Sequence, residues 1–201
     1  MDAPGAHQRP NDSPTSPLRA LHASGAERGR RCVLVTTRVI IVGDTHLPRF
    51  GRTLPPFLAD ALRDVDRILH VGDHTEPFVL ELLETFAPTD AVAGNNDPPE
   101  LVERLGLKRM VTIEAVRIGM THGHHGLGRT TPERAIRAFA SSDPRPQAIA
   151  FGHSHQPMIE RRDGVWLLNP GSPTDRRRQP TFSFIRLEVR GVELRPELVT
   201  S

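Results

Sequence analysis

The sequence predicts an α/β fold that mixes parallel and antiparallel strands, and two features carry this prediction. In the first half, short apolar runs alternate with stretches of helical spacing, as in parallel strands joined by helices. In the second half, Asp163-Gly164 and Gly191 each separate two apolar runs, which is the pattern of a β-hairpin.

The first half contains five expected elements. A β-branched run at 38–42 ends at Gly43-Asp44, and an apolar run at 67–71 ends at Gly72-Asp73. Pro77 suits the first turn of a helix, where its missing N–H costs nothing. We therefore expect strands at 38–42, 67–71 and 91–93, and helices at 54–62 and 77–86.

The second half is richer in strands. Two runs joined by a tight turn come first, a helical stretch follows, and the two hairpins complete the chain. We expect a helix at 132–140 and strands at 109–113, 116–121, 148–151, 158–160, 165–168, 182–189 and 192–198.

The length of 201 residues suits one domain with a tail. Residues 1–32 are rich in Pro, Ser, Ala, Gly and Arg and show no apolar period, so we expect a disordered tail there. Residues 33–201 form the expected single domain. Cys32 is the only cysteine, which excludes an internal disulfide.

The charge does not indicate a nucleic-acid partner. The formal net charge is +2, and Lys108 is the only lysine, so a small excess of arginine holds the pI near 9.4. The apolar stretch at 32–42 is too short to cross a bilayer. Arg30-Arg31 before it resembles a twin-arginine export signal, but no small-residue cleavage site follows. We expect a cytoplasmic protein without membrane association.

Polar residues follow five of the expected strands, and most of them come directly after a glycine. In open α/β sheets, sites lie outside the carboxyl ends of the strands, so these residues should converge. We expect each glycine to let the backbone turn sharply and aim the next side chain into the crevice. The motifs are Gly43-Asp44-Thr45-His46, Gly72-Asp73, Gly94-Asn95-Asn96-Asp97, Thr121-His122-Gly123 and Gly152-His153-Ser154-His155.

Each motif by itself also has an ordinary structural interpretation. An Asp after a strand caps a loop in many proteins, a Gly-Asp pair is usually a turn, and Asn95 alone would be a turn residue. Oxygen and imidazole ligands at five successive strand ends are hard to produce by chance, so the joint pattern favours a metal site.

The order Asp-x-His, Gly-Asp, Gly-Asn-x-Asp, His and Gly-His-x-His resembles the calcineurin-like metallophosphoesterases, in particular their small single-domain prokaryotic branch. The resemblance covers about residues 38 to 190 and includes Asn169-Pro170-Gly171-Ser172. It implies a sandwich of two mixed β-sheets flanked by helices.

The resemblance also implies a ligand set for two divalent transition-metal ions. Asp44, His46 and His155 would bind the first ion, Asn95, His122 and His153 the second, and Asp73 would bridge both. Mixed imidazole and oxygen ligands suit Mn, which we expect first, or Fe, Ni, Zn or Co. A hydroxide held between the two ions would then attack phosphorus in line.

Asn96 departs from the family pattern. Many members have a histidine there that acts as general acid, whereas Asn96 can donate a hydrogen bond but supplies no proton. His124, His125 and His74 are the candidates for a substitute, and His124 is the one taken as a candidate catalytic residue. His124 could instead be a supporting or surface residue, and His125 a solvated loop residue. Asp97 is expected to orient a metal-bound histidine. The arginines at 176–178 either hold phosphate or form a solvated loop.

Two classes of function remain open. The first is hydrolysis of a small phosphate ester, with diesters favoured and a phosphomonoesterase or nuclease as alternatives. Long nucleic acid is not expected, because the chain has little aromatic content. The second is a non-catalytic protein-interaction scaffold, which the complete ligand set disfavours. The C-terminal hairpins offer an edge that could pair across a homodimer or higher oligomer.

Overall fold

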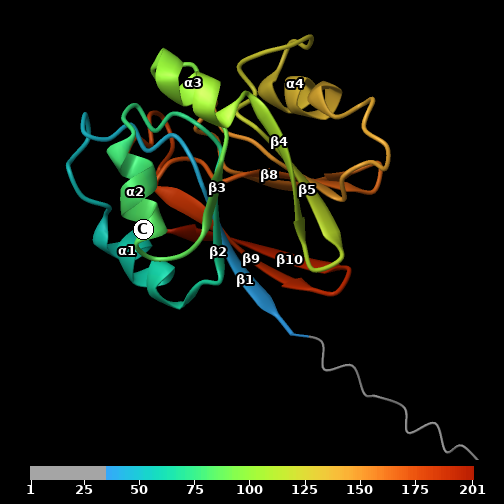
Figure 1. The fold of residues 1–201 in the computed structure, drawn as a ribbon, viewed down its shortest axis with the longest axis horizontal. Helices are drawn as coiled ribbons and strands as arrows, with labels where there is room; N and C mark the ends of the chain where they lie inside the picture. Colours follow the sequence, from blue (N-terminus) through green and yellow to red (C-terminus); the bar gives the residue numbers. More distant parts are fainter. Residues whose placement is uncertain (1–34) are drawn as a thin grey trace, which may run out of the picture. The chain divides into compact units, whose positions relative to one another are not determined.

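The structure is a computed structural model that describes residues 35–201. Within this range, ten strands form two five-stranded sheets, accompanied by four α-helices and one 3-10 helix (Figure 1). The predicted fold class, two mixed sheets flanked by helices, is confirmed. The tail predicted at 1–32 lies outside the described residues.

The first sheet has the strand order β10-β9-β1-β2-β3. β1 (Thr37–Val42), β2 (Arg67–His70) and β3 (Thr89–Ala91) are parallel, and β9 (Ser183–Arg190) runs antiparallel to β1. β10 (Glu193–Thr200) pairs with β9 as the predicted hairpin. β3 begins two residues before the predicted strand at 91–93, because Thr89 already pairs with Ile68.

The second sheet has the order β4-β5-β6-β8-β7. Its hairpins, β4 (Lys108–Ile113) with β5 (Val116–Thr121) and β7 (Met158–Arg162) with β8 (Val165–Asn169), match the prediction. β6 (Ala148–Ala150) lies between β5 and β8 and is parallel to both. The second half of the chain therefore forms a sheet that contains both parallel and antiparallel strand pairs.

Helices cover the outer faces of the sheets. α1 (Pro56–Ala61), the 3-10 turn Leu62–Asp64 and α2 (Phe78–Glu84) pack with Ile40 and Phe184 of the first sheet. α4 (Thr131–Ala138) packs its Ala135 against the second sheet. α3 (Pro99–Leu105) was not predicted, although Pro98-Pro99 before helix-forming residues is a helix-start signal. None of the described helices is long and apolar enough to span a bilayer.

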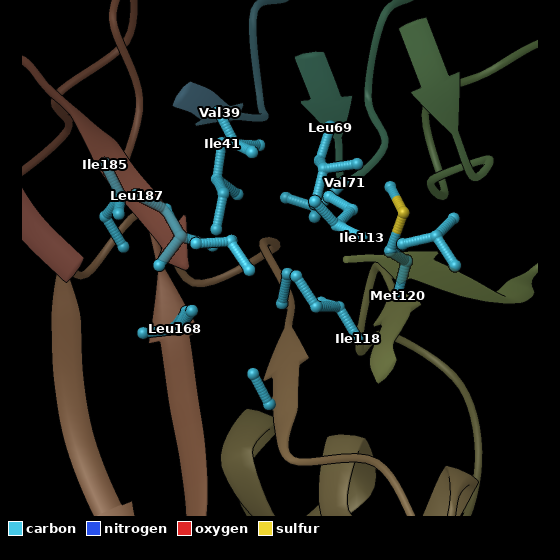
Figure 2. Close-up of a cluster of buried hydrophobic side chains, with 14 of the residues drawn as sticks. Val39, Ile41, Leu69, Val71, Ile113, Ile118, Met120, Leu168, Ile185 and Leu187 are labelled. Atoms are coloured by element: carbon cyan, nitrogen blue, oxygen red, sulfur yellow. The ribbon is translucent and has the colours of Figure 1, made fainter. Parts of the chain in front are cut away.

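The main core lies between the two sheets. Figure 2 shows Val39, Ile41 and Leu69 from the first sheet pointing toward Ile118 and Leu168 from the second. These side chains are fully buried, and burial of an aliphatic side chain contributes about 1.5–3 kcal/mol. The shared core fixes the two sheets against each other, so the loops after β1, β2 and β3 face those after β5 and β6.

Candidate metal centre

Five loops bring buried polar side chains together at one edge of the sandwich. They follow β1, β2 and β3 in the first sheet and β5 and β6 in the second. Two groups of side chains each place their possible ligand atoms within 4.8 Å of one another. The groups are Asp44 with His46 and His155, and Asp44 with Asp73 and His122.

The first group places two imidazole nitrogens against each other. Nε2 of His46 lies 3.3 Å from Nε2 of His155, and Nε2 of His155 lies 3.1 Å from Oδ1 of Asp44. All three residues are buried. Two neutral imidazoles can share only one proton at this contact, whereas a cation would accept both lone pairs and the carboxylate.

Asp73 belongs to the second group and also contacts the first. Its Oδ2 is 3.3 Å from Nε2 of His122 and 3.6 Å from Nε2 of His46. Oδ1 of Asp44 is also 4.0 Å from Nε2 of His122. Two carboxylates therefore reach both groups.

Asn95 and His153 lie beside this cluster but outside both groups. Oδ1 of Asn95 is 2.9 Å from Nδ1 of His153, so the two residues hydrogen-bond to each other. The ring of His153 lies 5.2 Å from that of His122, measured between centroids. The structure therefore brings all seven predicted ligands to one place, five of them within the two groups.

The sharp backbone turns fall mostly on the ligand residues themselves. Positive φ angles of 45° to 68° occur at Asp44, His46, Asp73, His153 and His155. Non-glycine residues in this region cost about 1–3 kcal/mol and cluster at functional sites. The prediction that the preceding glycines make these turns holds for Gly72, with φ 98°, and is wrong for the glycines before Asp44, Asn95 and His153.

Gly94 and Gly152 serve close packing. A Cβ atom on Gly152 would lie 2.6 Å from Oδ2 of Asp44, and one on Gly94 would overlap Oδ1 of Asp73. Glycine at these positions lets two backbone segments approach the two central carboxylates.

The carboxylates of the cluster favour protonation of two of its histidines. Burial lowers the pKa of His122, but contact with Asp73 and the charge of Asp44 outweigh it and raise the pKa to about 9. Burial likewise opposes protonation of His155, yet its contact with Asp44 raises its pKa. The pKa of His46 is lowered, mainly by burial. The pKa of Asp73 is also lowered, because His122 and Asn96 outweigh burial. Both carboxylates therefore attract positive charge.

Two buried atoms in the cluster make no hydrogen bond of acceptable geometry with the described residues, namely Oδ1 of Asp44 and Nε2 of His122, although they lie 3.1 Å from Nε2 of His155 and 3.3 Å from Oδ2 of Asp73, respectively. An unsatisfied buried polar atom costs about 1–3 kcal/mol. These two atoms lie 4.0 Å apart within one of the two groups, so the residues present fit a bound metal ion.

A calcineurin-like phosphoesterase superfamily domain matches residues 37–191. The chain belongs to this superfamily. A probable metallophosphoesterase of Methanothermobacter thermautotrophicus is 37% identical over 161 residues, which cover 79% of this chain and 90% of that protein. A phosphodiesterase of Methanocaldococcus jannaschii is 28% identical over 148 residues, covering 67% of this chain and 82% of that protein.

Solved structures show the same fold. Vps29 of Chaetomium thermophilum is 20% identical and aligns with a TM-score of 0.68, covering 82% of this chain and 96% of that one. The two proteins therefore share the arrangement of strands and helices.

The Asn169–Ser172 loop of this protein forms hydrogen bonds to two of the loops that carry the candidate ligands. The amide of Asn169, which is fully buried, donates to the Gly152 carbonyl at 3.0 Å and to Oγ of Ser154 at 3.1 Å. The Ser172 hydroxyl donates to the Asp44 carbonyl at 2.7 Å. The motif therefore positions the ligand backbone in both sheets.

Asp97 has a different partner from the predicted one. Its carboxylate contacts Nδ1 of His74 at 3.1 Å and accepts from the backbone N–H groups of Asp73, Thr75 and Gly94 at 2.7–3.1 Å. The expectation that it orients one of the candidate ligand histidines is wrong, because His74 lies outside the ligand set. Asp97 instead fixes the two loops that carry Asp73 and Asn95.

Asn96 donates two hydrogen bonds to Asp73. Its backbone N–H donates to Oδ1 of Asp73 at 2.9 Å, and its side-chain amide donates to Oδ2 at 2.6 Å. Asn96 thus holds both oxygens of the central carboxylate.

The three histidines considered as proton donors differ in access. His74 is fully buried and stacks on His70 at 3.7 Å between ring centroids, so it cannot reach a substrate. His125 is exposed. His124 is half-buried, with its ring 5.3 Å from that of His122. Burial and the neighbouring histidines lower the pKa of His124 to about 4, so it is neutral at pH 7.

Several residues of the site had no individual signal in the sequence. The carbonyl of Asp175 contacts Nδ1 of His155, and Nε2 of His70 contacts the Thr45 hydroxyl at 3.2 Å. Both contacts join segments far apart in the chain, which one sequence does not reveal. Of the arginines at 176–178, Arg176 binds carbonyls of its own loop and Arg177 pairs with Asp175.

Proposed function

We propose that this protein hydrolyses phosphoric esters, with phosphodiesters preferred, by means of two divalent metal ions. The observation that carries the proposal is the convergence of Asp44, Asp73 and three imidazole nitrogens at a buried point where two polar atoms make no hydrogen bond of acceptable geometry with the described residues. The superfamily match and the metallophosphoesterase relatives support the same reaction class.

The proposed ligand roles follow the two groups. Asp44, His46 and His155 would hold the first ion, and His122 with Asn95 and His153 the second. Asp73 would contact both, since its Oδ2 lies within 3.6 Å of a histidine nitrogen on either side. Asn95 and His153 would exchange their mutual hydrogen bond for the ion.

The bound ions would supply a hydroxide nucleophile near neutral pH and offset charge on the phosphoryl oxygens. Asn96 keeps Asp73 in position through its two hydrogen bonds. Neutral His124 can donate a hydrogen bond to a phosphoryl oxygen but is a poor source of a proton. Because a general acid contributes about 10²–10⁴-fold, its absence favours substrates with good leaving groups. The archaeal phosphodiesterase relative supports the diester preference.

The metal, the size of the substrate, the compartment and the oligomeric state are proposed from the sequence. Manganese is the first metal to test, since several transition metals suit the ligands. We propose a small phosphate ester as substrate, the cytoplasm as compartment and homodimer formation through the edge strand β10.

The test is an assay of metal-stripped protein on bis-p-nitrophenyl phosphate and p-nitrophenyl phosphate. Mn²⁺, Ni²⁺, Co²⁺, Zn²⁺ or Mg²⁺ is added back. We expect turnover of the diester that Asp73→Ala lowers by at least about 100-fold, since even residues that only orient metal ligands contribute about 10–100-fold. Asp64→Asn, an exposed carboxylate outside the site, is the matched control.

Other outcomes select among the alternatives. Preferential turnover of the monoester would indicate a phosphomonoesterase, and cleavage of oligonucleotides a nuclease. Folded protein that is inactive with every metal would overturn the proposal and favour an interaction scaffold.

A further inference from the structure

A cavity of about 320 Å³ lies beside the candidate metal centre. Its wall is formed by the segment that leads into α4 and by the loop between β6 and β7. Ser154, which separates the candidate ligands His153 and His155, is part of this wall. Asn169, whose amide reaches both Ser154 and the Gly152 carbonyl, is another part.

Thr131, which also lines the cavity, packs on the residue that follows His122. A Cβ atom on Gly123 would lie 2.7 Å from Cγ2 of Thr131, so the first turn of α4 packs directly on the His122 loop. The cavity and the metal centre are therefore neighbours.

Two arginines give the cavity a positive charge. Arg129 and Arg134 line it, and none of its lining residues is acidic. Neither arginine forms an ion pair with a carboxylate among residues 35–201, where the ion pairs involve other arginines. The two guanidinium groups thus keep their capacity to bind an anion.

Arg134 is also held in place. It is half-buried, and its Nε–H donates to the Gly128 carbonyl at 3.2 Å, which leaves the two terminal nitrogens for a ligand. The nearest acid in sequence, Glu133, accepts the backbone N–H of Arg129 at 2.7 Å through Oε2 and does not line the cavity. Arginine with two free terminal nitrogens matches two oxygens of a phosphate.

We propose that this cavity is a substrate subsite for a second phosphate group, separate from the phosphodiester that reacts at the metal centre. The inference rests on the proposed function, because the metal centre defines where the scissile phosphate lies. It adds a substrate class, namely diesters whose non-reacting part carries a further phosphate. Arg134 binds that phosphate, and Arg129 at the rim adds a second positive charge.

The test compares the p-nitrophenyl ester of thymidine 5′-monophosphate with the same ester carrying a 3′-phosphate. For the wild type we expect a kcat/KM about 10–100-fold higher for the 3′-phosphorylated ester, mainly through a lower KM, as for charged hydrogen bonds. Arg134→Gln and the exposed Arg129→Gln should reduce this ratio, Arg134→Gln to near one. Arg137→Gln, an exposed arginine of α4 outside the cavity, should keep the wild-type ratio.

A wild-type ratio near one, or equal ratios in the Arg134→Gln and Arg137→Gln variants, would overturn the subsite while leaving the hydrolase intact. If neither ester is turned over, the proposed function fails instead. Equilibrium binding of thymidine 3′,5′-bisphosphate and thymidine 5′-monophosphate then decides the subsite without turnover. Tighter binding of the bisphosphate that Arg134→Gln removes supports it, and equal binding contradicts it.

Discussion

At the scale of single residues, protons and cations compete for the same side chains. His122 carries a proton at neutral pH in the metal-free protein, because the carboxylates of Asp73 and Asp44 raise its pKa to about 9. A metal ligand must be deprotonated, so an ion that binds at the proposed ligand His122 would displace this proton. The affinity of the site for metal ions should therefore depend on pH.

We predict that metal affinity increases from pH 6 to pH 8. The increase should be about tenfold per pH unit for each proton displaced, and His155, whose pKa is also raised, can add to it. Calorimetric titration with Ni²⁺ in buffers of different ionisation enthalpy measures the protons released. His125→Ala, which removes an exposed histidine, should release as many protons as the wild type. Binding without proton release would contradict the prediction.

The candidate ligands could be identified from the sequence, while the hydrogen bonds that hold them in place could not. Asp44, Asp73 and His122 follow strands within Gly-Asp or Thr-His motifs, and this position indicated that they could bind metal. The bond from Ser172 to the Asp44 carbonyl joins residues 128 positions apart. Such a contact depends on how the two sheets pack, and no local pattern encodes it.

At the scale of elements, the Asn169–Ser172 loop connects the end of β8 to the ligand loops of both sheets. Asn169 makes three hydrogen bonds through its side chain, to Gly152, Ser154 and the N–H of Gly171. Its removal would leave a buried carbonyl without its side-chain donor.

We predict that Asn169→Ala lowers the free energy of unfolding by about 1–3 kcal/mol. It should also weaken metal binding by about 10–100-fold, because the loop of His153 and His155 loses its anchor. Urea denaturation and metal titration measure the two effects. Arg178→Ala, an exposed residue in the next loop, should stay within about 0.5 kcal/mol of the wild type. Wild-type stability together with wild-type metal affinity in Asn169→Ala would refute this role.

Element types were easier to predict than their ends. The hairpins at Asp163-Gly164 and Gly191 appear where the turn residues indicated. α3 was missed because its seven residues are few for a periodic pattern to show, and only Leu101 is buried among them.

At the scale of the whole molecule, the candidate metal centre draws its residues from both sheets. Asp44 and Asp73 come from the first sheet, and His122 and His155 from the second. A bound ion therefore acts across the interface in addition to the apolar core, and it stabilises only the folded arrangement.

We predict that metal ions raise the melting temperature of the stripped protein. At about 100 times the dissociation constant, one bound ion contributes about 2.7 kcal/mol, or roughly 5–10 °C for a protein of this size. Thermal unfolding followed by circular dichroism with and without Mn²⁺ measures the shift. Asp73→Ala should lose most of it, and Asp64→Asn should retain it. A melting temperature that does not respond to any transition metal would contradict a site between the sheets.

The sequence by itself determined the fold class, most of the strands and the seven candidate ligands, because apolar periodicity and strand-end motifs are local properties. The tertiary structure decided which of these residues meet. It placed Asp73 in contact with both groups, committed Asn96 to Asp73, buried His74 and left Arg134 without a carboxylate partner among residues 35–201, beside the candidate metal centre. These outcomes depend on the packing of two sheets against one core, and contacts between distant segments exist only once that packing has formed.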